Sequence, residues 1–203
     1  MIAKGGRLWI ISVLSIALTS FLVSFFITSF FMIISITFLI IVIFFIIFFR
    51  DPHRSIGENI VAPADGKIRD IKKNNDTYII STFMNVYNVH VNRMPINGRI
   101  ISIHHFPGKH IGAWKKEAEE NEKVTLDIQS DIGNIRIIQI AGCIARRIYP
   151  YVKNEDVLKK GDKIGIIRFG SRVDLYLSAD KITKILVKKG DKVYAGVTSI
   201  AQT

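Results

Sequence analysis

The sequence predicts a mainly β protein: a barrel-sandwich-like soluble domain with a short helix, preceded by an N-terminal transmembrane helical hairpin. Three observations lead to this fold class. A long uncharged apolar run lies near the start of the 203-residue chain. Short Ile- and Val-rich runs, separated by Gly, Asn and Asp, fill the remainder. A Lys-Lys-Gly-Asp-Lys sequence occurs twice near the C-terminal end.

The uncharged run extends from Leu8 to Phe49. One helix needs about 20 apolar residues to span a bilayer, so the run is long enough for two spans. Ile27–Ser29 is the expected turn between them. Basic residues flank the run on both sides, at Lys4, Arg7, Arg50 and Arg54. Because basic flanks favour the cytoplasm, we expect residues 1–49 to form a hairpin anchor with both ends on that side. A single span, with one basic flank outside, is the alternative.

The remainder, residues 50–203, has the size of one domain that can bury a core. Its Ile- and Val-rich runs, bounded by turn residues, are typical of β-strands. They are Lys67–Ile71, Tyr78–Phe83, Arg99–His104, Lys123–Ile128, Ile135–Ala141, Lys163–Phe169, Val173–Leu177 and Lys184–Val187. The spacing of Ala, Trp, Lys and Glu over Ile111–Asn121 predicts the one short helix.

The repeated sequence stands at Lys159–Lys163 and Lys188–Lys192. In each copy Gly-Asp is expected to form a turn before an apolar strand. Paired turns of this kind resemble those of biotinyl/lipoyl-type barrel sandwiches. We therefore expect antiparallel strands wrapped into a sandwich or a partly closed barrel.

The net charge and the cysteine count indicate which kinds of partner and which compartment suit the chain. The formal net charge is +11, which suits nucleic acid or an anionic surface. No nucleic-acid-binding motif is recognisable, and next to a membrane anchor anionic lipid is the simpler partner. Cys143 is the single cysteine, so an internal disulfide is excluded and a reducing compartment fits.

Four ordered segments carry a family resemblance. They are Val61–Gly66, Asn85–Pro95, Glu119–Glu122 and Ile167–Asp174. The last reads Ile-Arg-Phe-Gly-Ser-Arg-Val-Asp and resembles the self-processing site of the short, membrane-anchored phosphatidylserine decarboxylase proenzymes. A lone Gly-Ser pair is usually an ordinary turn, but four segments in the expected order cover nearly all of the soluble part.

The resemblance implies an enzyme that cuts itself between Gly170 and Ser171 and converts Ser171 into a covalent pyruvoyl cofactor. The mature enzyme would then consist of a large chain that ends at Gly170 and a small chain that starts at residue 171, and the two would stay together as a heterodimer within the decarboxylase domain of residues 50–203. The implied reaction is decarboxylation of phosphatidylserine to phosphatidylethanolamine, without pyridoxal phosphate. The implied location is the cell membrane, with the catalytic domain on the cytoplasmic face.

Self-processing needs a base, because an unassisted serine hydroxyl is a weak nucleophile. The resemblance points to His90 as the base and to Asp65 as the residue that orients it. Taken alone, Asp65 is typical of a hairpin turn and His90 of a half-buried strand residue. Other branches of the family have two histidines before Met-Pro; here Arg93 stands next to Met94. Whether His90 serves both self-cleavage and decarboxylation therefore stays open.

Two further groups of residues are candidate ligand sites. Arg146 and Arg147 are candidates for binding a lipid phosphate. The histidines His104, His105 and His110 match no strong zinc spacing, so we expect no metal site.

Two other classes of function remain as alternatives. A membrane-anchored, non-enzymatic barrel-sandwich adaptor also joins an anchor to such turns, although adaptors of export pumps usually carry long helical hairpins. A nucleic-acid binder is suggested by charge alone.

Overall fold

The computed structural model describes residues 1–108, 121–142, 147–168 and 171–203. The chain divides into two compact units, Met1–His53 and Arg54–Thr203. The predicted helix over 111–121 lies outside the described residues except for Asn121.

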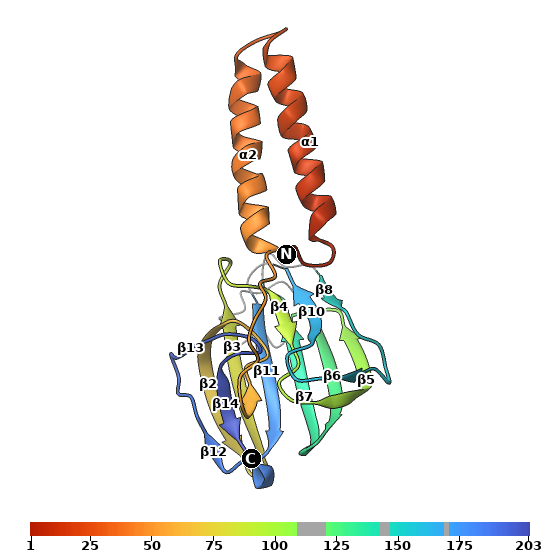
Figure 1. Cartoon of the computed structure of the whole chain (residues 1–203), viewed down its shortest axis with the longest axis vertical. Helices are drawn as coiled ribbons and strands as arrows, with labels where there is room; N and C mark the ends of the chain where they lie inside the picture. The colour runs from red at the N-terminus through yellow and green to blue at the C-terminus, as the bar shows by residue number, and fades with distance from the viewer. Residues whose placement is uncertain (109–120, 143–146, 169–170) are drawn as a thin grey trace. The chain divides into compact units, whose positions relative to one another are not determined.

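The first unit is a helical hairpin (Figure 1), formed by α1 (Gly6–Ser24) and α2 (Phe30–Phe48). Gly6 allows the start of α1 and Phe49 to approach closely at the base of the hairpin, because a Cβ at Gly6 would lie 2.6 Å from Phe49 Cγ. Midway along, Ser35 Oγ donates a hydrogen bond to the Ala17 carbonyl at 2.9 Å. The two predicted apolar helices are thus confirmed.

Both ends of the hairpin are joined by backbone hydrogen bonds. Ala3 N donates to the Phe49 carbonyl at 2.8 Å, and Asp51 N donates to the Met1 carbonyl at 2.7 Å. An isolated β-bridge between Ile2 and Arg50 lies between these bonds. The N-terminus and the exit from α2 therefore lie side by side.

The two helices are long and apolar enough to cross a membrane by length and composition. At 1.5 Å per residue, 19 residues extend about 28 Å, close to the thickness of a bilayer's hydrocarbon core. Most of their large apolar side chains are exposed, as expected for surfaces that face lipid rather than a protein core.

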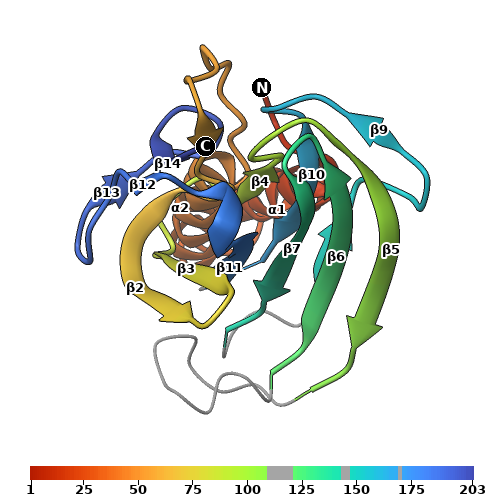
Figure 2. The same cartoon turned by 90° about the horizontal axis from the view of Figure 1, so that it is seen from below.

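The second unit is mainly β, as predicted, and its largest sheet curls into a half-barrel (Figure 2). Along this sheet the described strands are β13 (Lys192–Val193), β2 (Gly66–Asn74), β3 (Thr77–Met84), β11 (Ser171–Ser178), β7 (Gly133–Ile140), β6 (Lys123–Ser130), β5 (Gly98–Phe106) and β9 (Val157–Leu158). All of its pairings are antiparallel.

Two smaller antiparallel sheets accompany the half-barrel, and a short 3₁₀ helix, η2 (Ala179–Lys181), follows β11. One sheet contains β1 (Ile60–Val61), β14 (Ser199–Gln202) and β12 (Lys184–Ile185). The other contains β4 (Val91–Arg93), β10 (Lys163–Ile167) and β8 (Ile148–Pro150).

The core forms from alternate residues of the large sheet. Successive strand residues point to opposite faces, so one face of each strand is apolar and buried. Ile80, Val173, Leu175, Ile137 and Leu126 are all no more than 1% exposed. This face of β11 also carries Ser171, two residues before Val173.

The repeated sequence forms the same turn twice. Asp162 Oδ2 accepts a hydrogen bond from Lys159 N at 2.8 Å, and Asp191 Oδ2 accepts one from Lys188 N at 2.9 Å. The glycine of each copy has a left-handed φ of about +90°. The predicted turns are confirmed, each followed by a strand: β10 and β13.

Candidate active site

Ser171 is the first residue of β11 and lies between two neighbouring strands. It pairs with Met84 at the end of β3, while Arg172 pairs with Ile140 at the end of β7. Ser171 is 0% exposed, and its Oγ has no hydrogen-bond partner among the described residues. A buried hydroxyl without a partner costs free energy, and Ser171 shares this feature with Thr82 of the neighbouring strand β3.

His90 lies next to β10, fully buried, in the connection from β3 to β4. Its carbonyl accepts a hydrogen bond from Ile167 N at 3.3 Å, and its Nδ1 lies 2.8 Å from the Asn88 carbonyl. A carbonyl can only accept, so Nδ1 carries the proton in the neutral ring. The buried Nε2 is therefore the basic nitrogen.

The backbone brings His90 and Ser171 to the same edge of the β unit. Ile167, which binds the His90 carbonyl, is the last residue of β10, and Ser171 begins β11. Met84, the cross-strand neighbour of Ser171, ends β3, and the segment after it leads to His90. Sequence segments far apart in the chain are thus joined at this edge.

The Asp65 carboxylate is buried and hydrogen-bonded through both oxygens. It accepts hydrogen bonds from Arg54 Nη1 at 2.6 Å and Nη2 at 2.8 Å, and from Ala195 N at 2.8 Å. Both side chains of this ion pair are less than 10% exposed. His90 Nδ1 is hydrogen-bonded to the Asn88 carbonyl, so the role of Asp65 as the orienter of His90 stays a prediction.

Sequence reasoning missed Arg54 as a partner of Asp65 and Asn88 as the partner of His90. Every residue has a backbone carbonyl, so the sequence does not show which one contacts His90. In the sequence, Arg54 appears only as a basic residue that flanks the anchor. The available signal was general: a buried carboxylate needs a cation or several donors nearby.

Arg93 occupies the place where other branches have a second histidine. It is 7% exposed, its Nη1 donates to the Gly161 carbonyl at 3.0 Å, and its backbone N donates to the Pro63 carbonyl at 2.9 Å. The first contact connects β4 to the first repeated turn, and the second connects it to the segment before β2.

Two of the predicted site residues, Gly170 and Arg146, lie outside the described residues. Arg147 is exposed and directly precedes β8.

Among the three histidines His104, His105 and His110, the last lies outside the described residues. His105 Nε2 lies 3.0 Å from Glu122 Oε1, which also accepts a hydrogen bond from Ile148 N at 3.2 Å. Within the described ranges, no three His, Cys, Asp or Glu side chains gather as metal ligands.

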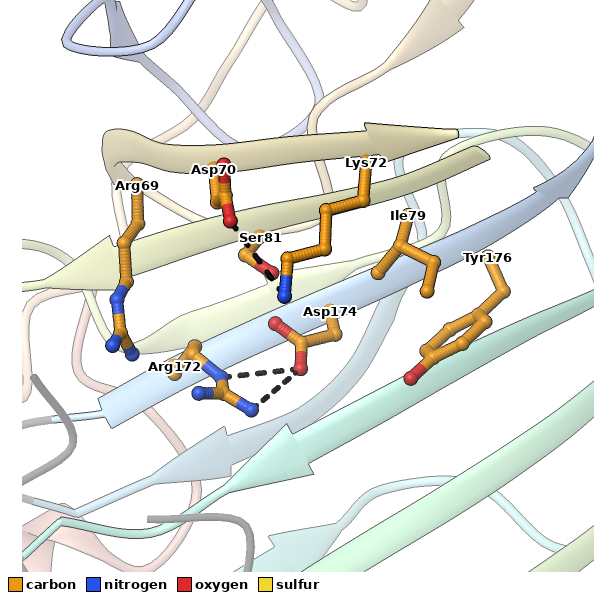
Figure 3. Close-up of a pocket in the computed structure, with 8 residues that line it drawn as sticks. All are labelled: Arg69, Asp70, Lys72, Ile79, Ser81, Arg172, Asp174 and Tyr176. Carbon is orange, nitrogen blue, oxygen red and sulfur yellow. Dashed lines mark hydrogen bonds and ion pairs between the residues drawn. The ribbon is translucent and has the colours of Figure 1, made fainter. Parts of the chain in front are cut away.

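A charged pocket of about 370 Å³ lies on the face of β11 opposite to Ser171 (Figure 3). It is lined by Arg69, Asp70, Lys72, Ile79, Ser81, Arg172, Asp174 and Tyr176. Arg172 Nη2 lies 2.9 Å from Asp174 Oδ2, and both side chains are less than 10% exposed. This buried ion pair lies within the first residues of the strand that Ser171 begins.

Comparison with known proteins places this architecture in one family. The family profile named phosphatidylserine decarboxylase matches residues 41–201. A phosphatidylserine decarboxylase proenzyme of Streptomyces avermitilis is 45% identical over 155 residues, covering 75% of this chain and 71% of the relative. One of Carboxydothermus hydrogenoformans is 39% identical over 170 residues, covering 78% and 79%.

A third relative matches the anchor as well. The putative archaetidylserine decarboxylase proenzyme of Methanococcoides burtonii is 39% identical over 209 aligned residues, covering 100% of this chain and 96% of the relative. The comparisons give no support to the non-enzymatic adaptor. With the profile spanning most of the β unit and relatives matching at this level, the chain belongs to the phosphatidylserine decarboxylase family, a family of decarboxylases.

Proposed function

We propose that this protein is a self-processing, pyruvoyl-dependent decarboxylase that converts phosphatidylserine to phosphatidylethanolamine. The observation that carries the proposal is Ser171. Its hydroxyl is fully buried and lacks a partner among the described residues, within the Gly-Ser motif that resembles the family's processing site. A serine hydroxyl becomes a good nucleophile when a neighbouring base takes its proton, and His90 is the proposed base.

The surroundings of Ser171 suit conversion to a pyruvoyl group. Met84 and Val173 flank it on the core face, and both are fully buried. A ketone needs fewer hydrogen bonds than a hydroxyl, so it fits this apolar neighbourhood better. A pyruvoyl group supplies an electrophilic carbonyl that takes up the electron pair released when carbon dioxide leaves.

Self-processing is assigned to Ser171 and His90. As His90 Nε2 takes its proton, Ser171 Oγ attacks the Gly170 carbonyl carbon; the peptide C–N bond breaks and the nitrogen is protonated, which leaves an ester. Loss of the Ser171 Cα proton then breaks the Cβ–Oγ bond and releases Gly170 as a carboxylate. Water replaces the nitrogen of the remaining dehydroalanine, so ammonia leaves and the pyruvoyl group forms.

The Asn88 carbonyl fits the task of orienting His90, because it fixes the proton on Nδ1 and leaves Nε2 basic. For Asp65 we propose an indirect contribution. Held by Arg54 and the Ala195 amide, it connects the segment before β2 to the segment after β13. Through this connection it would position the edge on which His90 lies.

The proposed substrate is a lipid with a serine head group. Both names found among the relatives specify a serine lipid, phosphatidylserine or archaetidylserine. Arg146 and Arg147 are proposed to bind its phosphate, because guanidinium groups pair well with phosphate oxygens.

The hairpin is proposed to anchor the enzyme in the cell membrane. Since the N-terminus and the exit from α2 are hydrogen-bonded to each other, a hairpin that spans the bilayer leaves both on one side. Lys4, Arg7, Arg50 and Arg54 favour the cytoplasmic side, and the positive charge of the chain favours anionic lipid there.

Intact mass measurement tests the processing step. The unprocessed chain is 23.0 kDa. The wild-type protein is expected as two associated chains divided after residue 170, with no free amine at the start of the small chain. Ser171→Ala is expected as one uncut chain, since the nucleophile is absent. Normal splitting of Ser171→Ala would refute the serine mechanism.

Carbon dioxide release tests the catalytic step. Processed protein is mixed with phosphatidylserine labelled at the serine carboxylate, without added cofactor. Release that stops with hydroxylamine, which takes the reactive carbonyl, is the expected result. A processed protein that releases no carbon dioxide from any serine phospholipid would overturn the decarboxylase assignment.

A further inference from the structure

A buried asparagine, Asn92, lies across the first residues of the strand that Ser171 begins. Asn92 is 0% exposed. Its Nδ2 donates to Met84 Sδ at 3.7 Å, and its Oδ1 accepts from Gln139 Nε2 at 2.7 Å. Met84 is the cross-strand neighbour of Ser171, and Gln139 is that of Val173. The carboxamide of Asn92 therefore bridges the two strands that flank β11, on the face toward which Ser171 points.

The neighbours of Asn92 fix which way round its carboxamide lies. The thioether sulfur of Met84 has no hydrogen to donate, so the nitrogen of Asn92 must face it. Gln139 then presents its own nitrogen to the Asn92 oxygen. Gly165 leaves room for this arrangement, because a Cβ there would lie 3.2 Å from Gln139 Nε2 and 2.8 Å from the Tyr149 carbonyl oxygen.

The sulfur of Met84 is a weak acceptor for the fully buried donor Asn92 Nδ2. Thioethers accept hydrogen bonds weakly, whereas oxygen atoms that carry charge accept them strongly. Cβ atoms of directly opposed residues in an antiparallel pair lie about 5 Å apart. The Asn92 donor thus contacts the side chain directly opposite Ser171, whose Oγ is a buried oxygen without a partner in the described part of the chain.

We propose that Asn92, held in place by Gln139, donates a hydrogen bond to the oxygen carried by residue 171. This inference rests on the proposed function. During processing, Oγ gives its proton to His90 Nε2 and gains negative charge, and a fixed donor stabilises the oxygen as that charge develops. After processing, Oγ has left with Gly170, and the same donor would bind the ketone oxygen that water supplies on the Cα of residue 171. Gln139 acts through Asn92 and is a positioning residue.

Asn92→Asp is the sharpest test, because it keeps an oxygen for Gln139 Nε2 and replaces the donor nitrogen by an acceptor. The full chain is made by cell-free synthesis with vesicles, pulse-labelled, and followed by the appearance of the two chains. Splitting is expected to slow on the order of 100-fold, the usual effect of losing one such donor. Asn92→Leu, which has a similar volume and no donor, is expected to slow it comparably.

Two matched controls separate the donor from general packing. Met84→Leu removes the sulfur and keeps the volume, and Thr82→Val removes a buried hydroxyl one row further along β3. Both are expected to split within about twofold of the wild-type rate. Met84→Leu conserves volume, and such core changes are tolerated best. Thr82→Val removes a hydroxyl that has no hydrogen-bond partner among the described residues, so no hydrogen bond is lost.

The pH profile gives a readout that a merely structural role would not change. Once protonated, the carboxyl group introduced by Asn92→Asp is again a donor, whereas protonation of the His90 base slows both proteins alike. The splitting rate of Asn92→Asp relative to the wild-type rate is therefore expected to rise as the pH falls. A ratio that stays constant with pH would overturn the proposal.

A wild-type chain that stays whole in this experiment refutes the proposed function itself. Wild-type splitting together with an unchanged rate in Asn92→Asp refutes only the donor. Equal slowing in Met84→Leu and Asn92→Asp would show that the amide–sulfur contact is structural, and would also refute it. If thermal unfolding shows that the Asn92→Asp protein has not folded, Asn92→Leu takes its place, and a wild-type rate in that variant refutes the donor.

Discussion

Asp65 and His90 have different hydrogen-bond partners, although the family resemblance assigns both to one catalytic group. The Asp65 carboxylate is buried with the Arg54 guanidinium, and removing one partner of a buried ion pair typically costs about 3–5 kcal/mol. His90 has one ring nitrogen on a backbone carbonyl, which makes the other nitrogen the basic one. Substitutions at the two positions should therefore fail for different reasons.

We expect His90→Ala to fold and to stay uncut, because the proposed base for Ser171 is then missing. Asp65→Ala should be cut more than His90→Ala but should unfold at a lower temperature, as should Arg54→Ala. Thermal unfolding and intact mass of the three variants check this. Normal cutting of a folded His90→Ala protein would remove His90 from the mechanism. Normal cutting combined with lost decarboxylation would show that the two steps use different bases.

Among the elements, the two repeated turns offer a matched comparison. Gly161 and Gly190 have nearly the same positive φ, so alanine strains the backbone equally, by roughly 1 kcal/mol. A Cβ at Gly190 would meet open space, whereas one at Gly161 would lie 2.2 Å from Ile56 Cδ1. We expect Gly161→Ala to lower the thermal unfolding midpoint clearly more than Gly190→Ala. Equal midpoints would mean that Ile56 moves aside freely.

The hairpin of β6 and β7 carries a titrating cluster. Partial burial acts to raise the pKa of Asp127, but hydrogen bonds from Arg136 and Ser102 outweigh it and hold the pKa below its usual value. A lowered pKa stabilises the fold above the unfolded-state value of about 3.9, and this is lost as the pH falls through the folded-state pKa.

Asp127→Asn should therefore reduce stability at neutral pH and have little effect in acid. Because Arg136 is 52% exposed and solvent screens the pair, we expect a loss of at most about 1 kcal/mol. Urea unfolding at pH 7 and below pH 3 measures it. A difference that persists unchanged in acid would mean that the loss does not come from the carboxylate charge.

The sequence predicted elements where local chemistry decides them. Gly-Asp turns and long Ile-rich strands such as β3 follow from turn geometry and side-chain alternation. The prediction began β11 at Val173, whereas the strand begins at Ser171. β4 was not predicted, because its Val-Asn-Arg sequence has little apolar character and its pairing with β10 is a long-range contact. The partners of Asp65 and Asn92 also depend on segments distant in the chain.

At the scale of the whole molecule, the topology of the anchor is testable. With both hairpin ends joined by backbone hydrogen bonds, Met1 and Thr203 are expected on the cytoplasmic side. Protease should digest the β unit in inverted vesicles and spare it in right-side-out vesicles. The opposite pattern would show that the anchor crosses the membrane in another way.

β11 begins at the proposed cut and is hydrogen-bonded to β3 on one side and β7 on the other. These two rows of hydrogen bonds form most readily while β11 is still linked to the rest of the chain, so we expect the uncut chain to fold first. Once cut, the protein loses the covalent link that made its folding unimolecular, and recovery from denaturation requires two fragments to meet. Processed protein diluted out of urea should stay inactive and aggregate, whereas Ser171→Ala should regain its structure. The enzyme's working life is then set by how slowly it unfolds, because each molecule has a single opportunity to fold.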